Sequence, residues 1–503
     1  MKEDAARRGT RLLIMAMPVT WGLGVVLARF ATWGTTAGSL VRPALVVALI
    51  SIILLLVARV LGRNWTWAAL ASSAVVLLGM REGLPGGLLA VTAIWLMLVD
   101  ALRRIARRPL LPEPTLLSIG RAPALFAVAF AVVMGWQASS EEINGVAPAT
   151  YPIYDSTGPP GPDIYLIVLD GYPRADTIAE TFGMSVQDFE RDLSSLGFTI
   201  SAGARSNYQS TWLTFASMLN GAYISDMLDA DPPPTISGQW RWLHSMIDHA
   251  ALLDVLESRG YRIRTIPSPF TTTALSSADD YIDLGYATDF EARLIAGSAV
   301  ALLAPETIAQ LLANGHRALV LDSLETTARL AEERVGPQFV LAHIESPHTP
   351  FVLHPRESDY VVVPSCFPTA CSLFQATMQE LGLTLDAYAD AMRYQIEALN
   401  SHVIMTVERI VEADPEAVVI LMSDHGSRYS LEDPDEHFRN LLAARTPGAE
   451  GLFDQTESPV NLLRLTLNAY LDVPTAALPY RSWGADWEYP LELGPPHEYD
   501  PAD

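Results

Sequence analysis

The chain has 503 residues, of which 50% are hydrophobic and 18% are charged, and its formal net charge is −24. This length suffices for two or three domains, and the composition excludes an intrinsically disordered chain. The acidic balance argues against nucleic-acid binding, which needs a basic face, and a total of two cysteines excludes a disulfide-dense scaffold.

The charge is divided unevenly along the chain. Residues 1–140 hold 14 of the 33 Lys and Arg residues and 5 of the 57 Asp and Glu residues, while the remainder holds 19 basic and 52 acidic residues. A basic, apolar first part joined to an acidic, mixed remainder predicts a membrane anchor followed by a soluble domain. Because the only lysine is Lys2, any fixed cation in a distant active site must be an arginine, a histidine or a metal ion.

Five apolar runs within residues 1–140 predict about five transmembrane helices, because a helix needs about 20 residues to cross a bilayer. The runs are 12–32, 43–61, 65–80, 84–102 and 122–138. The third run is short, and it could form a tight hairpin with the fourth. Basic residues gather at the N-terminus, between the second and third runs, and between the fourth and fifth runs. The positive-inside rule therefore predicts a multi-pass protein of the cell membrane with a cytoplasmic N-terminus and an extracytoplasmic domain.

The part of the chain after the membrane region alternates between strand and helix patterns. Residues 141–162, rich in Pro, Gly, Ser and Thr, predict a linker. A domain is expected over 163–482, followed by an acidic, proline-containing and loosely ordered tail, 483–503. An almost continuous apolar run at 163–169, with similar runs at 261–266, 338–344 and 417–422, is typical of strands buried on both faces. Helical patterns lie at 185–196, 212–219, 249–259, 321–333 and 385–413. The alternation predicts an α/β fold with a doubly wound sheet.

Polar residues follow three of these apolar runs, at the strand ends where ligands bind in such folds. Asp170 follows the first run, Asp424 and His425 follow the last, and the third run ends at His343, shortly before His348. Asp and His side chains gathered at strand ends outside the cell predict a divalent metal site. Taken singly, Asp-Gly could be a turn and Asp-His-Gly a helix N-cap.

A candidate nucleophile lies in residues 206–221, where a polar loop runs into a short amphipathic helix. A hydroxyl at a helix N-terminus lies beside free N–H groups and the positive end of the helix dipole, which can hold the oxygens of a phosphate or sulfate ester. The other interpretation is a plain Ser or Thr helix cap. Asn207 lies in the loop and Arg205 just before it. Both could bind the ester or could hold the loop in place.

These motifs together resemble the alkaline phosphatase superfamily, in its sulfatase-like branch, over residues 162–472. The resemblance rests on the strand ending in Asp170-Gly171, on the run Ser423-Asp424-His425-Gly426, and on Pro347-His348-Thr-Pro-Phe. In the sulfatase-like enzymes the nucleophile lies ten residues before a glycine that ends its helix, and here Gly221 places it at Thr211. Five spans before such a domain resemble lipoteichoic acid synthases and phosphoethanolamine transferases, and residues 458–464 also look like membrane-bound members.

The resemblance implies one divalent metal ion, with Mn, Mg, Zn and Ca not distinguished. Its ligands would be Asp170, Thr211, Asp424 and His425. Thr211 would be the nucleophile, and His348 would bind substrate or protonate the leaving group. Asn207 is the further substrate-binding candidate, and a second metal ion near Glu345 and His348 is left open.

Two departures from the family limit what the resemblance implies. Sulfatases carry Cys-x-Pro-x-Arg at the nucleophile, whereas this chain has Thr211-Trp-Leu-Thr-Phe, so formylglycine chemistry is not expected. The first acid is Asp170 rather than the Glu of lipoteichoic acid synthases, which leaves the subfamily open.

The resemblance favours a metal-dependent phosphoryl-group transferase of the phosphoglycerol or phosphoethanolamine type at the outer membrane face. Its partners would be the lipid bilayer and a phospholipid headgroup or envelope glycan substrate, without nucleic acid. The alternative is a membrane-anchored phosphodiesterase or sulfuric ester hydrolase. A third interpretation is a degenerate, non-catalytic binding protein, which the retained Asp170, Thr211, Asp424 and His425 argue against.

The two cysteines, Cys366 and Cys371, lie five residues apart in a proline-containing segment. In an oxidising compartment this arrangement favours a local disulfide, and a two-cysteine metal site is the alternative.

Overall fold

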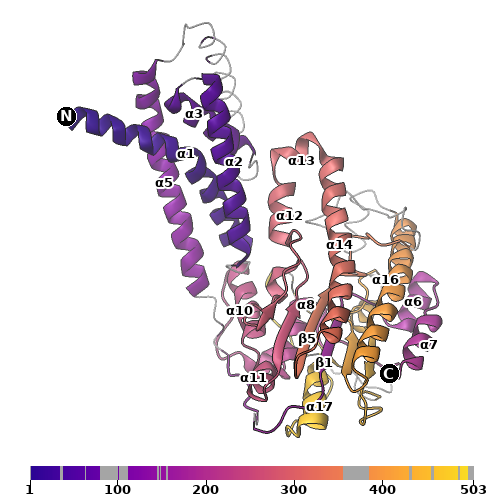
Figure 1. Ribbon diagram of the computed structural model, residues 1–503. Helices are drawn as coiled ribbons and strands as arrows, with labels where there is room; N and C mark the ends of the chain where they lie inside the picture. The colour runs from indigo at the N-terminus through magenta and orange to yellow at the C-terminus, as the bar shows by residue number, and fades with distance from the viewer. Residues whose placement is uncertain are drawn as a thin grey trace. The chain divides into compact units, whose positions relative to one another are not determined.

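The computed structural model describes residues 2–33, 38–62, 64–79, 100, 103, 112–143, 147, 149–154, 157–354, 384–429, 433–454, 458–484, 486 and 488–496. The chain forms two compact units (Figure 1). The first unit comprises Met1–Asn144 and Phe290–Ile308, and the second comprises Gly145–Asp289 and Ala309–Asp503. The cysteine pair at 366 and 371 lies outside the described residues.

The first unit is helical. Its helices are α1 (Lys2–Trp33), α2 (Gly38–Gly62), α3 (Trp65–Gly79), α5 (Glu113–Ile143), most of α12 (Asp289–Ala296) and α13 (Ala299–Leu303). Three stretches, Arg7–Thr32, Gly38–Leu61 and Glu113–Ser139, are long and apolar enough to cross a membrane, and Trp65–Leu77 is a shorter apolar helix. The long apolar helices match the first, second and fifth of the five expected spans. The third expected span corresponds to the shorter helix, and the fourth, 84–102, lies outside the described residues except for Asp100.

Small residues let these helices approach closely. A Cβ atom added at Gly24 of α1 would lie 2.7 Å from the Phe130 ring of α5. Trp21 packs beside it, with its ring centroid 5.6 Å from those of Phe126 and Phe130. Glycine is therefore required where α1 crosses α5, because any larger side chain would push the two helices apart.

The second unit is built on a mixed seven-stranded sheet, which confirms the α/β class. Its strands are β1 (Ile164–Leu169), β2 (Thr199–Ile200), β3 (Arg262–Ile266), β4 (Asp280–Tyr281), β5 (Gln338–Ile344), β6 (Val418–Met422) and β7 (Leu442–Arg445). The strand order is β2-β7-β6-β1-β5-β3-β4. β6, β1, β5, β3 and β4 run parallel, whereas β7 pairs antiparallel with both β6 and β2. The four apolar runs expected to be strands are confirmed as β1, β3, β5 and β6.

Helices cover both faces of this sheet. They are α6 (Ala175–Phe182), α7 (Gln187–Ser195), α8 (Thr211–Asn220), α9 (Ile224–Met227), α10 (Ile236–Asp248), α11 (Ala251–Ser258), α14 (Pro305–Glu332), α16 (Leu385–Ala413) and α17 (Pro459–Leu471). Because side chains alternate along a strand, Leu166 and Val168 of β1 pack against the layer of α8, α10, α11 and α17. Ile167 and Leu169 pack against α6, α7, α14 and α16. Both faces of β1 are apolar for this reason.

The C-terminal segment corrects one expectation. Trp483 is buried, and its ring stacks on Tyr208 with centroids 5.3 Å apart. Leu491 is also buried in the same core. A large aromatic side chain gains more by leaving water than the local acidic composition suggests, so the first part of the expected loose tail is packed.

Candidate functional site

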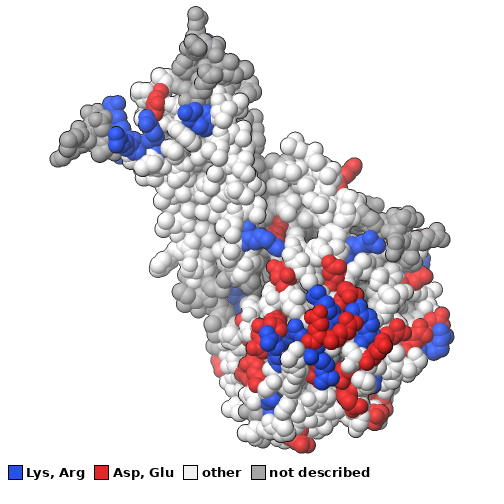
Figure 2. All heavy atoms as spheres, viewed as in Figure 1, with Lys and Arg blue, Asp and Glu red and all other residues white. Residues whose placement is uncertain are grey.

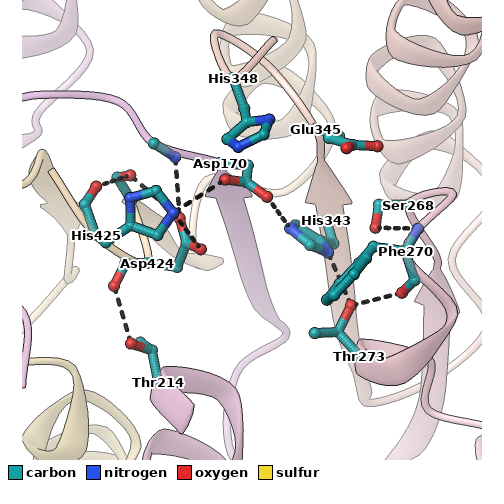
Figure 3. A network of polar contacts seen from close by, with 12 residues as sticks. Asp170, Thr214, Ser268, Phe270, Thr273, His343, Glu345, His348, Asp424 and His425 are labelled. Atoms are coloured by element: carbon teal, nitrogen blue, oxygen red, sulfur yellow. Dashed lines mark hydrogen bonds and ion pairs between the residues drawn. The ribbon is translucent and has the colours of Figure 1, made fainter. Parts of the chain in front are cut away.

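The site lies at the carboxyl ends of β1, β5 and β6. On the face that α8 covers, β1 presents Leu166 and Val168, and the alternation carries Asp170 to the same side. The same alternation of side chains along β5 and β6 places His343 and Asp424 on that side. Because β6, β1 and β5 are neighbours in the sheet, three polar groups far apart in the sequence meet at one edge (Figure 3).

Asp170, Asp424 and His425 form the centre of the site. His425 Nε2 lies 3.4 Å from Asp170 Oδ1 and 3.6 Å from Asp424 Oδ2. All three residues are buried, and these three atoms have no hydrogen-bond partner. Among the described residues, Asp170, Asp424 and His425 form a group that could hold a metal ion, because one ligand atom from each lies within 4.8 Å of the other two.

The residues present fit a divalent metal ion. Buried polar atoms without partners are costly, and two carboxylate oxygens and an imidazole nitrogen are ligands that such an ion takes. Ligands about 2.1 Å from a tetrahedral ion lie roughly 3.4 Å apart, which is close to the two distances from His425 Nε2 to the carboxylate oxygens. Burial alone would raise the pKa of Asp170, but the charge of His348 and the close approach of His343 and His425 hold that pKa well below its usual range.

Backbone contacts fix the orientation of these groups. The Gly171 N–H donates to Asp424 Oδ1 over 3.0 Å, which leaves Oδ2 to face His425. His425 Nδ1 lies 2.7 Å from the Gly426 carbonyl oxygen, an arrangement that places the proton on Nδ1 and leaves Nε2 as the lone-pair nitrogen. The Ser423 hydroxyl donates to the His425 carbonyl oxygen at 2.7 Å. These hydrogen bonds therefore hold residues 423–426 in one fixed arrangement.

His343 was not among the site residues expected from the sequence. Its Nε2 lies 3.3 Å from Asp170 Oδ2, and its Nδ1 lies 3.1 Å from the Thr273 hydroxyl. Its ring packs against Phe215 of α8, with centroids 4.8 Å apart. The signal available in the sequence was a polar residue near the C-terminal end of the mostly apolar run 338–344. A histidine holding the second oxygen of a metal-binding carboxylate orients that ligand.

Thr211 begins α8 and is buried. One turn farther along the same helix face, the Thr214 hydroxyl donates to the Asp424 carbonyl oxygen over 3.0 Å. The N-terminal turn of α8 therefore lies against the Asp424 segment. Ser210 occupies the N-cap position with extended backbone, and its side chain makes no cap hydrogen bond. The Ser210 hydroxyl is thus not used as the cap that the sequence left as the other interpretation.

The two loop residues upstream of Thr211 hold the loop. The Asn207 amide donates to the Arg481 carbonyl oxygen over 2.9 Å and accepts from the Val460 N–H over 3.1 Å. Arg205 forms a two-pronged pair with Asp435. Of the two roles left open for Asn207 and Arg205, these contacts support the structural one.

His348 lies beside the centre of the site. Its N–H donates to the Asp170 carbonyl oxygen over 3.0 Å, and its ring centroid is 6.3 Å from that of His425. The Thr349 carbonyl oxygen lies 2.7 Å from its Nδ1, so Nε2 is the nitrogen available to a ligand. Burial lowers the pKa of His348, opposed by the charge of Asp170. Its neighbour Glu345 accepts from His316 Nε2 through its carbonyl oxygen at 3.0 Å.

Arg428 is a second residue that the sequence analysis did not single out. Its Nη2 donates to the Gln209 carbonyl oxygen over 2.5 Å, two residues before Thr211. Burial lowers its pKa to about 10, and the nearby carboxylates of Asp170 and Asp424 oppose that change. The signal was its place three residues after His425 in a domain that has no lysine.

No protein-family model matches this sequence, and no curated protein matches it. Solved structures similar to the chain include the integral membrane protein lipooligosaccharide phosphoethanolamine transferase A (EptA) from Neisseria meningitidis, at 13% identity over 92% of this chain and 96% of that chain, with a TM-score of 0.41. The C-terminal periplasmic domain of EptC from Escherichia coli matches at 12% identity over 66% of this chain and 86% of that chain, with a TM-score of 0.39.

A 2-O GAG sulfatase also matches, at 14% identity over 65% of this chain and 73% of that chain, with a TM-score of 0.38. The Escherichia coli EptC domain is known in complex with Zn as well. These phosphoethanolamine transferases and sulfatases belong to the alkaline phosphatase superfamily, the group that the motifs of this sequence resemble. Likenesses at this level assign no activity to the chain.

Proposed function

We propose that this chain is a membrane-anchored, metal-dependent phosphoryl-group transferase of the phosphoglycerol or phosphoethanolamine type, with Thr211 as its nucleophile. The proposal includes a five-span anchor (1–140), a linker (141–162), a doubly wound, alkaline-phosphatase-like catalytic domain (163–482) outside the cytoplasm, and a C-terminal segment (483–503). The observation that carries it is the convergence of three unpartnered, buried ligand atoms of Asp170, Asp424 and His425 beside the helix that begins at Thr211.

Asp170, Asp424 and His425 would hold the metal ion, and Thr211 would complete the set. When bound there, a divalent cation supplies positive charge against the negative charge that develops on a phosphoryl group. Asp170 and Asp424 are kept in place by His343 and by the Gly171 N–H, so the ligands are preorganised.

Thr211 would attack the phosphorus atom of a phospholipid donor. The bond between Thr211 Oγ and phosphorus forms as the bond between phosphorus and the lipid oxygen breaks. The proton that leaves the Thr211 hydroxyl balances the proton that the departing lipid oxygen takes up. His348, whose Nδ1 is held by the Thr349 carbonyl oxygen, is the proposed carrier of that proton through Nε2. In the second step a hydroxyl of an envelope glycan attacks the phospho-threonine and restores Thr211.

Arg428 is the proposed cation for the non-bridging oxygens. The domain has no lysine for this purpose, and a guanidinium can donate two parallel hydrogen bonds to a phosphoryl group. Its contact with the Gln209 carbonyl oxygen holds it next to the start of α8.

The test uses the full-length protein purified in detergent. We expect at least one divalent ion per chain, and a mass increase after incubation with phosphatidylethanolamine and phosphatidylglycerol. Thr211→Ala should abolish the increase while keeping the metal, and Thr211→Ser, which retains a hydroxyl, should restore part of it. The mass of the adduct identifies the transferred group.

The alternative function, hydrolysis of a phosphate or sulfate ester, uses the same residues. An adduct released by water as fast as by an added glycan acceptor would favour the hydrolase. Metal-free, folded protein without any adduct would contradict both functions.

A further inference from the structure

One segment of the outer-domain sequence belongs to the same compact unit as the membrane helices. Residues Phe290–Ile308 group with Met1–Asn144. The side chain of Phe290 is fully buried in a cluster with Val26 and Phe30 of α1 and Ala138 of α5. The rings of Phe30 and Phe290 meet edge to face, with centroids 6.2 Å apart. This segment therefore packs on the helices long enough to cross a membrane.

The contacts are made at one end of those helices. Phe30 lies in the last turn of α1, Ala138 lies near the end of α5, and Arg42 lies near the start of α2. Glu291 of α12 forms a two-pronged ion pair with Arg42. The chain direction of each helix places these three ends on the same side of the predicted spans. Charged side chains at the ends of spans mark the level of the lipid headgroups.

The segment after Glu291 is apolar and partly uncovered. No charged residue occurs between Arg293 and Glu306, a run that contains α13. On α13, Val300 is 57% exposed and Leu303 is 86% exposed. Figure 2 shows an uncharged surface over α13. Twelve uncharged, mostly apolar residues are too few to span a bilayer, and such a run is typical of a segment that lies in the membrane interface.

An apolar stripe on α2 continues from the same end. Val41, Leu45 and Leu49 recur at helical spacing and are each more than half exposed, and the stripe begins at the turn that carries Arg42. The exposed side chains of α13 thus belong to a unit whose outer surface is already made for lipid.

We infer that α12 and α13 form an interfacial hairpin whose apolar tip, Val300 and Leu303, inserts into the outer leaflet of the lipid bilayer. The occupant of this face is phospholipid. The ion pair between Arg42 and Glu291 holds the hairpin at headgroup level, and Phe290 locks it to α1 and α5. This inference does not depend on the proposed reaction.

The experiment places the photoreactive amino acid p-benzoylphenylalanine at position 303 or at position 335 of the full-length protein. Val335 is the matched control, since it is an equally exposed apolar residue (95%) in the turn after α14. Each protein is reconstituted in vesicles of phosphatidylethanolamine and phosphatidylglycerol, irradiated, and analysed by intact mass. Both positions are exposed, so neither replacement should disturb folding, and a thermal melt verifies this.

We expect a phospholipid adduct at position 303 that is about tenfold more abundant than at position 335. Equal lipid labelling at the two positions would overturn the inference. Capture of another copy of the chain at position 303 would also overturn it, because the tip would then be a protein interface.

Discussion

The hydrogen bond from Thr214 to the Asp424 carbonyl oxygen links the helix of the proposed nucleophile to the segment of the proposed metal ligands. Both residues are fully buried, and the bond is 3.0 Å long. Thr214→Val keeps the shape of the side chain and removes the donor, so it leaves a buried carbonyl oxygen without this partner. The expected loss of unfolding free energy is about 1–3 kcal/mol. For a domain of this size that corresponds to a fall in melting temperature of roughly 2–6 °C.

The assay is thermal unfolding of the detergent-purified protein followed by tryptophan fluorescence, together with the phospholipid adduct measurement. Thr214→Ser is the control, because it keeps the hydroxyl and should melt closer to the unchanged protein. Thr211→Val should show the opposite behaviour, with loss of the adduct and a smaller change in melting temperature. If Thr214→Val abolished the adduct while Thr211→Val retained it, the nucleophile would be Thr214 and the assignment would be refuted.

Three further predictions concern the surroundings of the site. Gly426→Ala should remove the metal and the activity, because a Cβ atom there would lie 2.2 Å from the Glu436 carbonyl oxygen. Gly315→Ala is the control and should leave both intact, because there is open space around Gly315. Normal metal content in Gly426→Ala would contradict the prediction. Burial lowers the pKa of His316 to about 4, so the folded protein keeps it neutral while the unfolded chain protonates it below its ordinary pKa of 6.5. The free energy of unfolding therefore decreases as pH falls from about 6.5 to 4, by on the order of 2 kcal/mol between pH 7 and pH 5. Chemical denaturation at these two pH values should show a smaller decrease for His316→Gln than for the unchanged protein. The same decrease in both proteins would argue against a neutral, buried His316. Arg428→Gln should lower the rate of adduct formation about 10- to 100-fold at unchanged metal content. Arg428→Lys, which keeps a positive charge, should recover part of the rate. An unaltered rate in Arg428→Gln would show that Arg428 does not bind the substrate.

The residues near the chain's strand ends show how far local pattern reaches. Asp170, Asp424 and His425 are recognisable from the sequence because each lies within three residues of the end of an apolar run, and the run itself fixes where the buried strand ends. The start of a helix close to Thr211 is likewise a local feature, and α8 ends at Asn220, before Gly221, where the backbone turns left-handed at φ 60°. Hydropathy and charge along residues 1–140 are local as well, which is why the long apolar helices could be predicted.

Other features depend on which segments become neighbours, and the tertiary structure alone decided them. His343 joins the site because β5 pairs with β1, and nothing in either strand's own sequence specifies that pairing. Asn207 holds a loop because residues 460 and 481 come beside it from more than 250 positions away. Phe290 packs on the long apolar helices α1 and α5 although it follows β1, β2, β3 and β4 of the second unit in the sequence. Periodicity tells which face of an element is apolar, but it carries no information on the distant element that covers that face, so such contacts were settled only by the folded chain.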